Sequence, residues 1–256
     1  MATVLRCLTI LVAIVLAALL FTPTLHAASP QASAADQALL QAANRDRAAA
    51  GLPPLHWDAA LAAAAHQHAL LMAKKNTLSH QFPSEPPMQD RARQAGARFS
   101  LVAENVAQGP SVAGLHTQWM NSPPHRANLL DPALNAVGIS VVQSGSTYFA
   151  VQDFSSSVVA MSLEEQEQQV ASQLASRGLR KDRSTADARK TCALDRGWSG
   201  QKPASVAIYE TADLSRLPSE IDQRLASGKY HSAAVGACEA GPSGSFSRYR
   251  IAILLF

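Results

Sequence analysis

The sequence is poor in cysteine, in aromatic residues and in net charge. Its 256 residues include three cysteines, 5% aromatic residues, and 22 basic against 19 acidic side chains. Three cysteines are too few for a scaffold held together by many disulfides. The near balance of charge excludes a strongly basic protein that binds nucleic acid or anionic membranes. The apolar fraction of 47% is ordinary for a globular protein, so a normal core can be buried.

Long hydrophobic runs are absent except at the beginning of the chain. Arg6 precedes an apolar run from Leu8 to Phe21, which is too short to cross about 30 Å of hydrocarbon at 1.5 Å per residue. Pro23 and a cluster of small residues follow, with cleavage expected after Ala28 or Ala34. We therefore predict a signal peptide over residues 1–34 and a secreted or periplasmic location. An uncleaved anchor is the alternative, and no transmembrane segment is expected after signal removal.

The cysteines predict one disulfide. Cys7 lies inside the predicted signal, which leaves Cys192 and Cys238 for the exported protein. Two thiols in an oxidising compartment are expected to pair, and a loop of this length gives about 4 kcal/mol in the chain-entropy model. Two free thiols that bind a metal are the alternative, but the paired CxxC spacing of such sites is missing.

Residues 35–156 predict a mixture of helices and one hairpin. Capping residues and apolar spacing favour helices that begin near Asp36, Asp58, Asp90, Val112 and Pro123. Between the third and fourth helices, only a connecting segment is expected through Glu104 and Asn105. Two β-like runs, 136–143 and 147–155, are separated by a tight polar break and predict a β-hairpin. His68 belongs to the apolar stripe of its helix and is expected to be buried and hydrogen-bonded.

The composition changes after residue 156. Ser162 and Glu165 form a capping-box pattern that opens a helix to about residue 176, and a basic exposed segment follows to residue 190. We predict a helix and linker over 157–190. A strand, a helix and two further strands over 191–256 then predict a small α/β domain.

The usual nucleophile motifs are missing. The sequence has no strand-to-helix GxSxG elbow, no HExxH pair, no phosphate-binding glycine loop and no free cysteine in the exported part. Any chemistry must therefore come from dispersed His and Glu residues.

From about residue 36 to residue 156 the sequence resembles the CAP superfamily (cysteine-rich secretory, antigen 5 and pathogenesis-related-1 proteins) in its cysteine-free bacterial form, the SCP type. The two sharpest motifs are Ala-Glu-Asn-Val at 103–106 and Trp-Met-Asn-Ser-Pro-Pro-His-Arg-Ala-Asn-Leu-Leu at 119–130. The remaining matches occur in the order of the family: Asn44, Arg47, Gly51, Trp57, Leu61, His68, Met72, His80, Arg91, Gly96 and Val137-Gly138-Ile139.

The resemblance implies an α-β-α sandwich with a cleft that two histidines and two acidic residues line, and that holds a divalent metal in some members. His80, Glu104 and His125 match three of these four positions, and we add Asn105 and His116 to the predicted cleft. The chain departs from the family twice. Pro124 replaces the usual glycine, and no acidic residue follows Trp119, where many eukaryotic members carry the second glutamate.

Two imidazoles and one carboxylate are a reasonable ligand set for Zn²⁺ with one position open to water. Because the fourth group is missing, the water would lack a second carboxylate to take its proton. The principal hypothesis is therefore a binding module for a small apolar ligand, a metal, or an extracellular protein or cell-envelope partner; lipid and sterol binding are known in the family. The alternatives are a metal-dependent hydrolase of peptides or envelope polymers, and a purely structural module.

Overall fold

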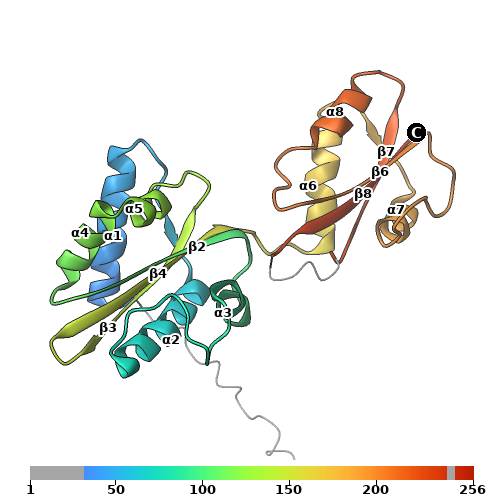
Figure 1. Cartoon of the computed structure of the whole chain (residues 1–256). Helices are drawn as coiled ribbons and strands as arrows, with labels where there is room; N and C mark the ends of the chain where they lie inside the picture. The colour runs from blue at the N-terminus through green and yellow to red at the C-terminus, as the bar shows by residue number, and fades with distance from the viewer. Residues whose placement is uncertain (1–31, 241–245) are drawn as a thin grey trace, which may run out of the picture.

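The computed structural model describes residues 32–240 and 246–256. The predicted signal peptide lies outside the described residues except for its last three positions. Two separate four-stranded sheets, each with its own helices, make up the described chain (Figure 1). Within these residues, no helix combines the length and the apolar character that crossing a bilayer requires.

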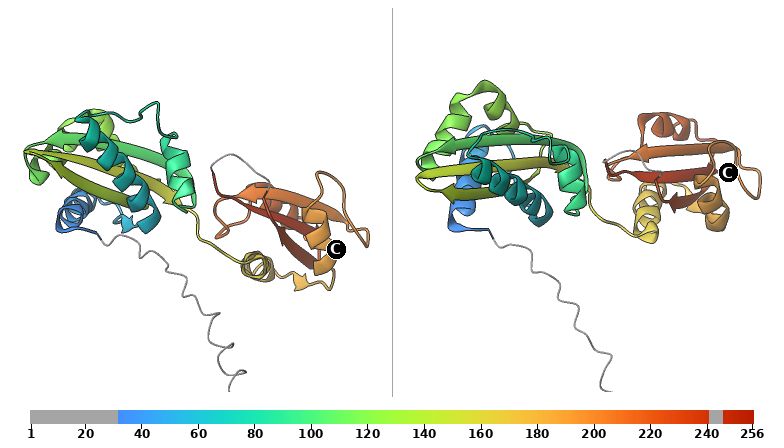
Figure 2. Two further views of the ribbon diagram at one scale, coloured as in Figure 1. Left: turned by 90° about the horizontal axis from the view of Figure 1, so that it is seen from below. Right: turned by 60° about the horizontal axis from the view of Figure 1, so that its bottom comes forward.

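The first sheet contains β1 (His56–Trp57), β2 (Phe99–Gly109), β3 (Ala136–Ser144) and β4 (Thr147–Ser157), in the order β1-β3-β4-β2. Helices cover both of its faces (Figure 2). One face packs against α1 (Ala34–Ala49), α4 (Val112–Asn121) and α5 (Pro123–Leu129). The other packs against α2 (Ala59–Lys75) and α3 (Met88–Gln94). This is the predicted α-β-α sandwich.

Local signals explain most of these elements. Ser33 caps α1 in a capping box with Asp36, and Asp58 accepts hydrogen bonds from the first turn of α2. The β3–β4 hairpin turns at Gly145, which has a φ of 60°. The sequence analysis was wrong about β2, for which it expected only a connecting segment. Polar residues such as Glu104 and Asn105 interrupt its apolar pattern, so β2 lacks the alternation that indicates a strand.

Arg47 fastens α1 to the loop that follows α5. Its side chain is buried, and its guanidinium donates to the carbonyls of Leu129, Asp131 and Leu134 at 2.9–3.0 Å. Burial lowers the pKa of this guanidinium. A buried cation that is satisfied by carbonyl groups fixes the end of α5, and α5 carries His125.

The second sheet contains β5 (Arg180–Lys181), β6 (Ser205–Thr211), β7 (Ser232–Cys238) and β8 (Tyr249–Leu255), in the order β5-β7-β8-β6. Helices α6 (Leu163–Ala175) and α8 (Ser219–Leu225) pack on one face, and α7 (Thr185–Cys192) packs on the other. The predicted disulfide joins Cys192 to Cys238 with a Cα–Cα distance of 5.8 Å. It ties the end of α7 to the end of β7 in a small α/β C-terminal domain.

Residues 157–190 contain more regular structure than the predicted helix and linker. Val170 and Leu174 of α6 are buried in the core of the second sheet, and Leu179 joins them. The basic segment 177–190 is largely exposed, as expected, yet it contains β5 and most of α7. Because charged residues dominate this segment, its sequence did not reveal the two short elements. The buried side chains of Leu179 and Ala188 hold them against the core.

In both sheets a helix crosses a strand glycine at very short range. A Cβ atom at Gly138 of β3 would lie 2.0 Å from the main-chain nitrogen of Ala62 in α2. A Cβ atom at Gly236 of β7 would lie 2.1 Å from the main-chain nitrogen of Arg189 in α7. Main-chain atoms of a helix cannot shift without displacing the whole helix. Both positions therefore exclude any side chain.

We expect Gly138→Ala to lower the free energy of unfolding of the first domain by about 2–3 kcal/mol, because α2 must move off the sheet. Urea denaturation followed by the fluorescence of Trp57 and Trp119 measures the change. Gly145→Asn is the control, because asparagine tolerates the left-handed turn and open space surrounds this position. A wild-type denaturation midpoint for Gly138→Ala would contradict the proposed close packing.

Candidate functional site

The structure brings His80, Glu104 and His125 together at the edge of the first sheet. His80 follows α2, Glu104 lies on the edge strand β2, and His125 lies on α5. His80 Nδ1 is 2.8 Å from Glu104 Oε1, and the rings of His80 and His125 are stacked with centroids 6.4 Å apart. The His80 side chain is 59% exposed, whereas that of Glu104 is 7% exposed. The site is therefore an exposed His80 beside a half-buried His125, above a buried carboxylate.

The second oxygen of Glu104 is bound by Arg91, a residue that the sequence analysis did not assign to the site. Arg91 lies on α3 with a side chain only 6% exposed, and its guanidinium donates to Glu104 Oε2. The same guanidinium also reaches the main-chain oxygen of His80 at 3.3 Å. It thus fixes both members of the His80–Glu104 pair.

Glu85 extends this network into the core. It lies 3.4 Å from Arg91 Nη1 and 2.9 Å from Nδ1 of His68. His68 is fully buried, and its Nε2 lies 2.8 Å from the carbonyl oxygen of Ser79, so the prediction of a buried, hydrogen-bonded histidine is confirmed. The irregular loop that carries Glu85 has no sequence periodicity, and the partners of Glu85 could not be inferred from spacing.

Asp153 of β4 is a second acidic residue that the sequence did not reveal. It is directly opposite Glu104 in the β2–β4 pairing and is fully buried. Burial raises the pKa of this carboxyl well above its usual range, and the neighbouring charge of Glu104 raises it further. Burial and the adjacent Glu104 therefore favour the neutral form of Asp153.

His125 is held in place from both sides. Its Nδ1 is 2.8 Å from Ser122 Oγ, and its main-chain oxygen accepts a hydrogen bond from Asn105 Nδ2 at 3.0 Å. Asn105 is completely buried and also accepts from Asn128 at 2.9 Å. Asn105 therefore orients the α5 segment and is itself inaccessible to a ligand.

The electrostatics of the two histidines differ. The hydrogen bond to Glu104 raises the pKa of His80, against an opposing effect of burial. Burial lowers the pKa of His125, and repulsion from His80 lowers it further. At a pH between the two values, His80 carries the charge and His125 remains neutral.

His116 is placed elsewhere. It lies on α4, and its Nε2 is 2.6 Å from Asp46 Oδ2 of α1. Among the described residues, no hydrogen bond, ion pair or ring contact joins it to His80, Glu104 or His125. Its membership of the cleft stays a prediction, and its visible role is to connect α1 with α4.

The arrangement of the site does not fit a three-ligand metal centre. Both oxygens of Glu104 already have partners, and the guanidinium of Arg91 beside them opposes a second cation. Within residues 32–240 and 246–256, no group of three or more His, Cys, Asp or Glu side chains is arranged to hold a metal ion. The zinc site over His80, Glu104 and His125 stays a prediction that would require Glu104 to leave Arg91.

Comparison with known proteins identifies the first domain. Residues 40–154 match the family model described as the cysteine-rich secretory protein family, CAP. The uncharacterized protein YkwD of Bacillus subtilis (strain 168) is 31% identical over 128 residues, which are 50% of this chain and 50% of that protein. Residues 40–154 therefore form a CAP domain of the bacterial SCP type.

Solved structures align with about half of the chain. An extracellular protein containing a SCP domain from Bacillus anthracis is 33% identical, with a TM-score of 0.43, over 46% of this chain and 39% of that one. An outer surface protein from Borrelia burgdorferi is 19% identical, with a TM-score of 0.46, over 50% of this chain and 96% of that one. The chain spans about half the length of the curated relative that it matches.

The raised pKa of His80 makes a prediction about pH and stability. A group whose pKa is higher in the folded state contributes stability that is complete below its unfolded pKa and is lost as pH rises through the folded pKa. We therefore expect wild-type protein to lose more stability than His80→Asn between about pH 5.5 and about pH 8.5. Urea denaturation at several pH values measures the difference, and NMR titration of the His80 ring checks the pKa directly.

His56→Asn is the matched control, since His56 is an exposed histidine outside the site. Asp153 and His125 also titrate, and the charge of His80 lowers the pKa of His125, so NMR titration of both histidine rings separates their contributions. Identical pH dependence in wild type and His80→Asn would show that Glu104 does not stabilise the charged imidazole.

Proposed function

We propose that the chain is an exported binding protein whose CAP domain contacts its partner through the histidine pair His80 and His125. The observation that carries the proposal is the geometry of His80. Glu104 holds its Nδ1, which leaves Nε2 on a largely exposed ring, next to the stacked ring of His125. An exposed imidazole that is held in place beside a second, half-buried imidazole suits a partner that supplies hydrogen-bond acceptors.

The charge of the site indicates which chemical groups the partner carries. The pKa of His80 is raised, and the buried carboxylate beneath it is already paired with Arg91. The site therefore offers a hydrogen-bond donor that becomes cationic as pH falls. We propose a partner that carries carboxylates, such as the peptide stems of a bacterial cell envelope. A small apolar ligand fits an exposed histidine pair less well.

Export supports an extracellular setting for this binding. The apolar run from Leu8 to Phe21 predicts a signal peptide, and the disulfide between Cys192 and Cys238 suits an oxidising compartment. The capping box of α1 depends on Ser33, so cleavage after Ala28 keeps this cap whereas cleavage after Ala34 removes it. We therefore propose a mature chain that begins at Ser29 and is secreted or periplasmic.

Binding is tested with the mature chain, residues 29–256, and purified peptidoglycan sacculi in a sedimentation assay. We expect the double variant His80→Asn/His125→Asn to bind about tenfold more weakly than wild type, a loss of about 1.4 kcal/mol. His56→Asn is the control for a lost exposed histidine and should bind as wild type does. Phosphatidylglycerol vesicles form a second arm that tests a lipid surface in place of the envelope polymer.

The structural module is the competing explanation. If the double variant binds as tightly as wild type, or if wild type binds neither sacculi nor vesicles, the histidine pair has no role in recognition. A large fall in melting temperature without a change in binding would then assign the pair to loop stabilisation.

One observation favours hydrolysis as a second candidate. A carboxylate that holds one ring nitrogen of a histidine while the other faces outward is typical of a general base. We expect any turnover to be lost in His80→Asn and, if a metal takes part, in the presence of a chelator. Release of soluble fragments from labelled sacculi measures it, and metal analysis of the purified protein shows whether zinc is bound. An absence of turnover in wild type would remove this candidate.

A further inference from the structure

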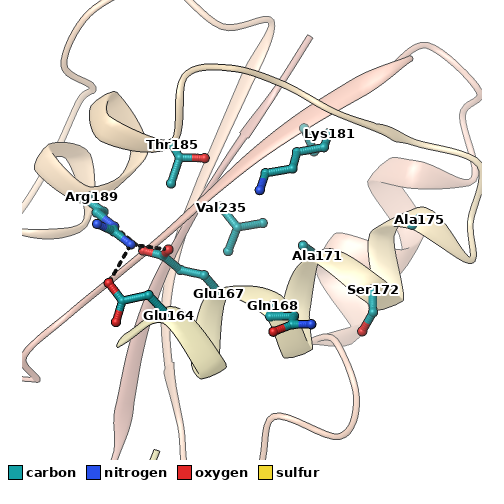
Figure 3. Close-up of a pocket in the computed structure, with 11 residues that line it drawn as sticks. Glu164, Glu167, Gln168, Ala171, Ser172, Ala175, Lys181, Thr185, Arg189 and Val235 are labelled. Atoms are coloured by element: carbon teal, nitrogen blue, oxygen red, sulfur yellow. Dashed lines mark hydrogen bonds and ion pairs between the residues drawn. The ribbon is translucent and has the colours of Figure 1, made fainter. Parts of the chain in front are cut away.

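A groove in the C-terminal domain lies between α6 and α7, beside the short strand β5. Its volume is about 660 Å³, which is within the range of about 300–1,000 Å³ that is usual for ligand sites. Figure 3 shows α6 along one side, α7 across from it, and Val235 of β7 between them. The floor is made of small apolar side chains, Ala171, Ala233 and Val235.

The groove follows an edge of the second sheet that is only partly paired. β5 pairs with β7 at Ser232 and Ala233 alone, where Asp182 N donates to Ala233 O at 2.8 Å. Further along, Ala237 N donates to the carboxylate of Glu167 at 3.0 Å. The C=O of Ala233 and the N–H of Ala237 both belong to odd-numbered residues. The N–H and C=O groups of odd-numbered residues in β7 therefore point toward this edge.

Val235 is the odd-numbered residue between them. Ser232 exchanges both main-chain hydrogen bonds with Phe256, so the even positions of β7 face β8 and the main chain of Val235 faces the groove. No hydrogen bond joins the main-chain N–H or C=O of Val235 to any other described residue. An unpaired N–H and C=O on a strand edge form a template for another extended chain.

Charge is unbalanced at one end of the groove. Lys181 lines it, and Arg180 and Arg183 flank Lys181 in sequence. All three side chains are exposed, and none forms an ion pair with any residue of the described ranges. At the other end Arg189 pairs with both Glu164 and Glu167, at 3.0 and 2.7 Å, so that end keeps one net negative charge (Figure 3). The open end therefore attracts an acidic group.

We propose that this groove binds an extended peptide segment that carries an acidic side chain. The peptide main chain pairs with the N–H and C=O of Val235, its acidic side chain lies at Lys181, and its small apolar side chains contact Ala171. A simple anion would satisfy Lys181 but would leave the main chain of Val235 unpaired, and a peptide satisfies both. The site lies in a different domain from the histidine pair and does not depend on the function proposed there.

Selection of linear hexapeptides displayed on phage, against the mature chain 29–256, tests the proposal. Counter-selection against Lys181→Glu removes peptides that bind elsewhere. We expect enriched peptides to contain an acidic residue among β-branched ones, and a synthesised peptide to bind about tenfold more weakly to Lys181→Glu. Lys190→Glu is the matched control, because it reverses an exposed lysine of α7 that does not line the groove. Failure to enrich any peptide, or equal binding to both variants, would overturn the proposal.

The main-chain pairing has its own test, which leaves the protein unchanged. N-methylation of alternate amides in the selected peptide should abolish binding for one set of positions and spare the other, because only one edge of an extended chain faces β7. In parallel, hydrogen exchange of the Val235 amide should slow when the peptide binds. If both N-methylated sets bind equally, or if exchange at Val235 is unaffected, no strand is added at this edge.

Discussion

The buried ion pair between Arg91 and Glu104 is the interaction on which the histidine site depends. Both side chains are at most 7% exposed, and loss of one partner would leave the other charge buried, at a typical cost of about 3–5 kcal/mol. The pair joins α3 to the edge strand β2. Through Glu104 it fixes His80, and through Arg91 it reaches Glu85 and the core histidine His68. This network of buried side chains thus fixes the imidazole of His80 at the surface.

The same ion pair governs what the site can do. A carboxylate that neutralises an arginine is a poor ligand for a metal ion and a weak base, so Glu104 serves mainly to orient His80 and to stabilise its charged form. Asp153 adds no negative charge beneath the pair while burial keeps its pKa high. The two imidazoles remain accessible, which supports the proposed role in recognition of a partner.

The sequence predicted the parts of the structure that local signals or family resemblance specify. The capping box at Ser162 and the β3–β4 hairpin follow from short-range patterns, and the single disulfide follows from the number of cysteines and the predicted export. The capping box at Ser33 was not predicted. The meeting of His80 with Glu104 followed from the resemblance alone, because no spacing rule relates residues so far apart. Neither source revealed the partners of Arg91 or the position of Asp153. Those contacts depend on the tertiary placement of α3 and of the β2–β4 register, in which charged side chains are buried together.

The two sheets differ in how the main-chain groups along β2 and β7 are hydrogen-bonded. Along β2 three outward carbonyls are covered: that of Phe99 accepts from Ser247 N at 2.7 Å, that of Glu104 from Asn128, and that of Val106 from the indole of Trp119. These bonds oppose the addition of a strand at β2, which supports the proposed contact through side chains such as His80. Along β7 the side chain of Glu167 covers one position and β5 another, while the main chain of Val235 is left between them. This difference supports the proposals of a side-chain site in the first domain and a main-chain site in the second.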